Sequence, residues 1–112
     1  MLTVKVLREL FRNLQQFRAL YESEGIDEVV SPIDGQVYSL FDLEHLYEQL
    51  HRLPPRQREA IELCLVQNMK ETDAALAMGV SKTNPVAMYA TSGLEKLVEF
   101  VQSGVLSGYR EI

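Results

Sequence analysis

Apolar residues recur at three- and four-residue spacing in the first part of the chain, which predicts an amphipathic helix over residues 4 to about 24. The apolar positions of this helix are Leu7, Leu10, Phe11, Leu14, Phe17 and Tyr21. We expect this face to pack into the protein core. Most of the same positions also fit about two heptads of a coiled-coil seam, so pairing of two chains through this helix is the alternative. A separate basic face, formed by Lys5, Arg8 and Arg12, is either solvated or meets an acidic surface.

The helical pattern is interrupted over residues 26 to 38, where Pro32 and the pair Asp34-Gly35 favour a turn. This stretch predicts an irregular connector with at most a very small hairpin. Ser39 is a candidate N-cap for the helix that follows, residues 40 to about 52, because Asp42 stands three residues later as in a capping box. The apolar face of this second helix consists of Leu43, Leu46 and Leu50.

Three more helices are predicted from the same spacing, over residues 56 to about 68, 70 to 78, and 85 to about 102. Pro55 precedes the first of them, at a position where a helix tolerates proline. Gly79 ends the second, since glycine readily adopts the left-handed conformation found just past a helix end. Asn84 is the expected N-cap of the last helix, with Pro85 at its first position. The side chains expected to point inward from the last helix are Val86, Ala90, Leu94 and Leu97.

These elements predict an all-α, single-domain protein. We divide it into an N-terminal amphipathic helix and irregular connector over residues 1–38, a helix-turn-helix unit over residues 39–102, and a C-terminal tail over residues 103–112.

The helix-turn-helix prediction rests on a short helix, a glycine, an apolar residue and a polar turn before another helix. Ala75 is small, as required where a second helix crosses. Gly79 supplies the turn, and Val80 fills the angle between the two helices. The polar turn leaves backbone amides free at the start of the last helix, and such amides suit a phosphate.

The stretch Leu53-Pro54-Pro55-Arg56-Gln57-Arg58-Glu59, followed later by Gly79-Val80-Ser81, resembles region 4 of bacterial RNA polymerase sigma factors, including the extracytoplasmic-function type. The resemblance covers residues 42 to 101. Residues 1 to 38 do not resemble the sigma region that binds the other promoter element, so a complete sigma factor is not predicted. Small phage-encoded helix-turn-helix proteins look similar, which suggests a bacterial or phage source.

The resemblance implies a unit that docks on the flap of the polymerase β subunit and reads the -35 promoter element with its last helix. It places two arginines near DNA phosphates, a turn over residues 82–84 against the DNA backbone, and the last helix in the major groove. The DNA-binding residues that the resemblance implies are Arg56, Arg58, Lys82, Thr83, Asn84, Ala87, Met88, Thr91 and Ser92. Tyr89 is a further candidate for a contact with bases or phosphates if the protein binds DNA.

The charge distribution argues against strong DNA binding by the last helix. The 112-residue chain has 11 Lys and Arg against 16 Asp and Glu, a net charge of -5, which is the wrong sign for indiscriminate coating of nucleic acid. No charged residue stands between Pro85 and Leu94. Guanine readout normally uses Arg or Lys, so this helix differs from the recognition helices of the family.

Two functions therefore remain open. The first is a sequence-specific transcription regulator that binds DNA, as a dimer so that two weak half-sites add. The second is a protein-interaction module that binds RNA polymerase or another partner through the same fold without reading DNA. In that case Met88 and Tyr89 form an adaptable contact face.

Little in the sequence points to catalysis, and we expect no catalytic residue, metal or cofactor. One cysteine, Cys64, excludes an internal disulfide, and its apolar neighbours favour a buried thiol over a nucleophile. His45 stands beside Glu44 and near Glu48, a pattern more typical of a solvated helical face than of an acid-base site. Signal-peptide, lipidation and membrane-spanning patterns are also missing, so a cytoplasmic protein without membrane association is expected.

Overall fold

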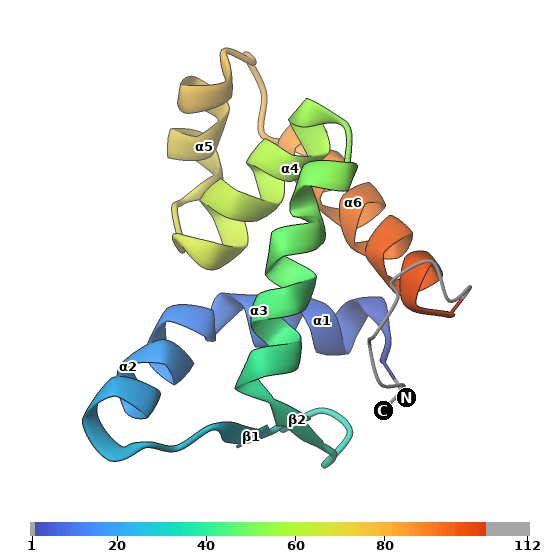
Figure 1. Cartoon of the computed structure of the whole chain (residues 1–112). Coiled ribbons are helices and arrows are strands. Elements are labelled where there is room, and N and C mark those ends of the chain that lie inside the picture. The colour runs from blue at the N-terminus through green and yellow to red at the C-terminus, as the bar shows by residue number, and fades with distance from the viewer. Residues whose placement is uncertain (1, 103–112) are drawn as a thin grey trace.

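A computed structural model describes residues 2–102 of the chain (Figure 1). The helices and strands, in chain order, are α1 (Val4–Arg12), α2 (Leu14–Glu24), β1 (Glu28–Val30), β2 (Val37–Ser39), α3 (Leu40–Glu48), η1 (Gln49–Arg52), α4 (Pro55–Ile61), η2 (Glu62–Val66), α5 (Glu71–Met78) and α6 (Asn84–Gln102). The mostly helical fold is confirmed, with one two-stranded antiparallel hairpin in the described part. The C-terminal tail, residues 103–112, lies outside the described residues.

The first predicted helix is two helices, because the chain breaks at Asn13. The Asn13 side chain donates a hydrogen bond to the Glu9 carbonyl oxygen at 2.9 Å, which competes with continued helical bonding. Helix α1 buries Val6, Leu7, Leu10 and Phe11, while α2 turns away toward the hairpin (Figure 1). Tyr21 on α2, which the periodicity placed on the inner face, is 54% exposed.

The short hairpin between α2 and α3 is confirmed, and it pairs Val29 with Tyr38. Tyr38 is buried beneath the hairpin, and its hydroxyl donates a 2.6 Å hydrogen bond to the Asp34 carboxylate. Burial alone would raise the pKa of Asp34. Hydrogen bonds from Tyr38, the Gln36 amide and Ser31 outweigh it and hold the pKa below its usual value. The carboxylate at the turn is therefore stabilised in its charged form.

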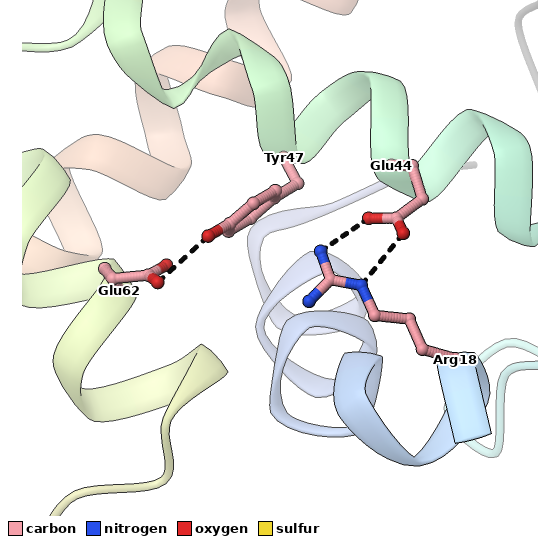
Figure 2. Close-up of polar contacts among 4 residues, drawn as sticks. All are labelled: Arg18, Glu44, Tyr47 and Glu62. Atoms are coloured by element: carbon pink, nitrogen blue, oxygen red, sulfur yellow. Dashed lines mark hydrogen bonds and ion pairs between the residues drawn. The ribbon is translucent and has the colours of Figure 1, made fainter.

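Three elements are tied together by a polar contact that Figure 2 shows. The Arg18 guanidinium on α2 donates two hydrogen bonds to the Glu44 carboxylate on α3, at 2.8 and 2.6 Å, and lies over the Tyr47 ring. The Tyr47 hydroxyl donates in turn to Glu62 of η2 at 2.9 Å. The hydrogen bond to Glu44 raises the pKa of Arg18, while burial and the bond to Glu62 raise the pKa of Tyr47. Arg18 stays charged and Tyr47 stays protonated at neutral pH.

The core lies where α1, α3, α4 and α6 meet. Ser39 caps α3 as expected, since its hydroxyl accepts a hydrogen bond from the Asp42 amide, and the apolar face of the second predicted helix is buried. The four inward residues expected on the last helix, Val86, Ala90, Leu94 and Leu97, are also buried. Within residues 2–102, no helix is long and apolar enough to cross a bilayer.

Candidate nucleic-acid interface

The corner between α5 and α6 has the geometry of a helix-turn-helix. Gly79 ends α5 with a φ of 71°, in the left-handed region. The Val80 amide then donates to the Ala75 carbonyl oxygen at 3.0 Å, which closes the helix end. Ala75 itself is buried at the corner. The left-handed turn expected at Gly79 is confirmed, and the Val80 side chain is half-buried against the core.

The last helix starts one residue earlier than expected. Asn84, which we expected to cap α6, is its first residue, and the Thr83 carbonyl oxygen accepts a hydrogen bond from the Ala87 amide at 3.2 Å. Pro85 remains within the first turn, where no hydrogen bond from its nitrogen is needed, so the shift costs the helix nothing. In the turn before α6, Lys82 is exposed and Thr83 is half-buried.

The N-terminal half of α6 presents an open outer face. A shallow depression there is lined by Ala87, Met88, Thr91, Ser92 and Glu95. Met88 is 68% exposed, although it is a large apolar residue. The four residues that the resemblance placed toward the major groove thus lie together on one accessible surface: Ala87, Met88, Thr91 and Ser92. Asn84, which the resemblance placed in the turn against the DNA backbone, is exposed at the start of the same helix. We call these five residues the α6 outer face.

Tyr89 does not share this face. It is half-buried and packs against the hydrophobic core, because it lies on the side of α6 that turns toward the bundle. We therefore interpret Tyr89 as a packing residue, which the sequence analysis had grouped with possible DNA contacts.

The two arginines of α4 lie in different places. The Arg56 guanidinium donates to the Met78 carbonyl oxygen at the end of α5, so it lies next to the helix-turn-helix corner. Arg58 lies two residues along the helix, in a separate groove that it shares with Tyr47 and His51. The structure brings Arg56 near the turn and leaves Arg58 apart from the α6 outer face.

Helix α1 adds two basic residues that the sequence analysis did not connect with α6. The Nη2 atom of Arg8 donates a 2.9 Å hydrogen bond to the Thr91 hydroxyl, across 83 residues of sequence. Arg8 and Arg12 also line a hollow together with Ala87 and Thr91. The basic stripe on the first helix was the only sequence signal, and nothing in the pattern indicated that it meets the last helix.

Cys64 lines the same hollow and is half-buried at the edge of the core. Burial, reinforced by the nearby charge of Glu71, raises the pKa of the Cys64 thiol. The side chain is therefore a thiol at neutral pH, which fits the expectation of a packing residue rather than a nucleophile. In the part of the chain that the structure describes, no group of three or more His, Cys, Asp or Glu is placed to hold a metal ion.

In a comparison with protein families, the family model of sigma-70 region 4 matches residues 43–84. No curated protein and no solved structure matches the chain. The matched segment runs from α3 through α5 and the turn, and it stops at Asn84, the first residue of α6. The chain thus contains a sigma-70 region 4-like helix-turn-helix domain, a transcription-related type of DNA-binding domain, and most of α6 lies beyond the match.

Proposed function

We propose that this chain, built around a sigma-70 region 4-like helix-turn-helix, is a cytoplasmic transcription regulator that places α6 in the major groove of DNA. The observation that carries this proposal is the α6 outer face. It directly follows the helix-turn-helix turn, and Met88 at its centre is 68% exposed while the opposite side of α6 is buried. A recognition helix must have one face free in this way to contact base edges.

The residues of the α6 outer face suggest which bases it would read. Asn pairs well with adenine, Ser and Thr bond to several bases, and apolar side chains contact the thymine methyl group. The face has Asn84, Ala87, Met88 and Ser92 but no Arg or Lys, the residues that usually read guanine. We therefore propose a preference for A·T base pairs.

Phosphate contacts would come from the residues around the turn. Lys82 is exposed in the turn before α6, and the guanidinium of Arg56, a residue of α4, lies next to the end of α5. The Arg56 guanidinium uses one hydrogen bond on Met78, which leaves other donors of its five for a phosphate oxygen. We leave Arg58 out of this interface because it lies in the groove beside Tyr47 and His51.

The test is binding to a pool of DNA duplexes with a random core, measured by fluorescence anisotropy at about 0.05 and 0.2 M salt. Bound duplexes are recovered and sequenced, and we expect salt-sensitive binding that enriches an A·T-rich motif. Met88→Asp should abolish this binding, because it places a negative charge in the groove. Phe41→Asp is the matched control, since Phe41 is 79% exposed on α3. This variant also replaces an exposed apolar side chain with a negative charge, but outside the proposed interface.

Equal binding of wild-type protein and Met88→Asp would contradict the placement of α6 in the groove. The symmetry of the selected motif reports whether one or two copies bind. The dimer expected through the first helix is not part of the proposal, because Leu7, Leu10 and Leu14 are buried inside the single chain.

A protein-docking function is the second candidate, and the family match favours it in one respect. The match ends at Asn84, so it covers the scaffold of the domain and not the helix that would read DNA. In this case the uncharged α6 outer face would bind RNA polymerase or another protein, with Met88 as an adaptable apolar contact. Absence of DNA binding at low salt, together with capture of bacterial RNA polymerase that Met88→Asp abolishes, would establish this function instead.

A further inference from the structure

We propose that α1 supplies the positive charge that the α6 outer face lacks, with Arg8 and Arg12 forming a binding site for DNA phosphates beside that face. This inference rests on the proposed DNA-binding function and extends the interface to a helix outside the matched segment, residues 43–84. The ligand chemistry is the phosphodiester backbone, which guanidinium groups bind through paired hydrogen bonds.

The position of the two arginines is the first argument. They line one hollow together with Ala87 and Thr91 of α6. Ala87 and Thr91 also line the depression on the α6 outer face, so the two surfaces are continuous. A duplex seated with its bases against that face would bring a phosphate strand past α1, since each groove is bordered by its backbones.

The availability of the two guanidinium groups is the second argument. Within residues 2–102, neither Arg8 nor Arg12 forms an ion pair; the described ion pair of an arginine belongs to Arg18. Arg8 uses one donor on Thr91, and a guanidinium has five. Arg12 is exposed at the end of α1. Both groups therefore have donors free for a phosphate oxygen.

The local charge balance is the third argument. Glu71 is the acidic residue that lines the hollow, against the two arginines, so the hollow has a net positive charge. The adjacent depression on α6 contains Glu95 and no basic residue. Positive charge at this border offsets the repulsion that Glu95 would exert on DNA.

The rigidity of α1 is the fourth argument. Its opposite side is held in the core by Val6, Leu7 and Leu10, each at most 1% exposed. The Asn68 side chain also donates to the Arg12 carbonyl oxygen at 3.0 Å, which ties the end of α1 to the segment before α5. The backbone positions of both arginines are thus fixed relative to the helix-turn-helix, so the helix that carries them needs no ordering when they bind.

The experiment compares wild-type protein with Arg8→Gln/Arg12→Gln, measuring affinity for the random-core duplex pool across a salt titration. Each lost phosphate contact should lower the magnitude of the log-log salt slope by about 0.9 and reduce affinity about tenfold at 0.1 M salt. Arg8→Lys/Arg12→Lys should retain most of the slope because it retains the charge. Arg52→Gln is the matched control, since Arg52 is exposed on η1 and lines neither surface.

Two results would overturn the inference while leaving the proposed function standing. An unchanged salt slope in Arg8→Gln/Arg12→Gln would show that α1 does not touch the backbone. Tighter binding by that variant would show that α1 obstructs α6. If wild-type protein shows no salt-dependent DNA binding, the proposed function fails and the inference fails with it.

Folding of each variant is checked by thermal unfolding. If loss of the bond between Arg8 and Thr91 unfolds the double variant, Arg12→Gln alone provides the test, because the described structure gives its guanidinium no hydrogen-bond partner. A slope reduced by about one contact in that variant supports the inference, and an unchanged slope overturns it.

Discussion

The contact between α4 and α6 depends on Gly93, and replacing this glycine with alanine tests the packing of the domain. A Cβ atom at position 93 would lie 2.7 Å from the Cδ1 atom of Ile61 and 3.2 Å from a Leu53 methyl group. Ile61 is itself fully buried, so its side chain has little room to move away. The glycine lets the helix that carries the α6 outer face lie close against α4.

Two opposing effects set the size of the change. Alanine in place of glycine within a helix stabilises it by about 1 kcal/mol. Overpacking of a filled core costs about 1 to 3 kcal/mol. Since the nearest contact is well inside van der Waals distance and both partners are buried, we expect Gly93→Ala to destabilise the protein by about 1 kcal/mol net. For a domain of this size, the melting temperature should fall by about 5 °C.

Ile61→Val makes the test specific, because it removes the Cδ1 atom that the new methyl group would meet. In the Ile61→Val background, Gly93→Ala should be neutral or slightly stabilising, with a coupling energy of about 1 to 2 kcal/mol between the two changes. The assay is chemical unfolding of the wild type, both single variants and the double variant. The difference between Ser92→Ala and Ser92→Gly, at an exposed neighbouring position, measures the effect of helix propensity alone.

The reasoning would be refuted if Gly93→Ala stabilised the protein as much as that propensity difference predicts and showed no coupling to Ile61→Val. Such a result would mean that α4 and α6 are not in close contact at Gly93. The orientation of the α6 outer face relative to the rest of the domain would then differ from the one described above.

Two further predictions concern local structure. The pKa of Asp34 is held below its ordinary value of 3.8, so its stabilising contribution is complete above that pH and is lost as the pH falls through the lowered pKa. Thermal melts of the wild type between about pH 2 and pH 6 should therefore show an acid-dependent loss that Asp34→Asn reduces, and parallel curves would contradict the assignment. Gly79→Ala should destabilise the helix-turn-helix by about 1 kcal/mol, because the residue has a φ of 71°, which alanine adopts only at a cost. No neighbouring atom lies within 4 Å of the added Cβ, so a steric clash adds nothing to this cost. Chemical unfolding measures this, and an unchanged midpoint would show that the left-handed conformation is not required.

In the proposed interface, base contacts and phosphate contacts come from different elements, because the basic residues lie outside the α6 outer face. A recognition helix whose outer face has no Arg or Lys has little means to hold the DNA backbone by itself. In this protein the basic groups that we assign to the DNA backbone come from other elements: Lys82 in the turn, Arg56 on α4, and the two arginines of α1. A helix with weak base readout would then be positioned by charges around it.

Local signals in the sequence determined most of the elements of this protein. Ser39 caps α3 and Gly79 ends α5, as expected, and Pro55 stands at the start of α4, which begins one residue earlier than expected. These signals are readable because each acts through backbone groups within a few residues. The same holds for the inward face of α6, which depends only on helical spacing. The sigma region 4 resemblance also rested on contiguous motifs, and the family match confirms it over residues 43–84.

Other features were decided by the tertiary structure. The apolar spacing continues through Asn13, so periodicity alone could not show that the helix breaks there and leaves Tyr21 exposed. The different placements of Arg56 and Arg58 depend on what packs on each side of α4. The approach of Arg8 to Thr91 joins residues 83 positions apart. Such a contact follows from how α1 docks on the core, and no pattern within one helix contains that information.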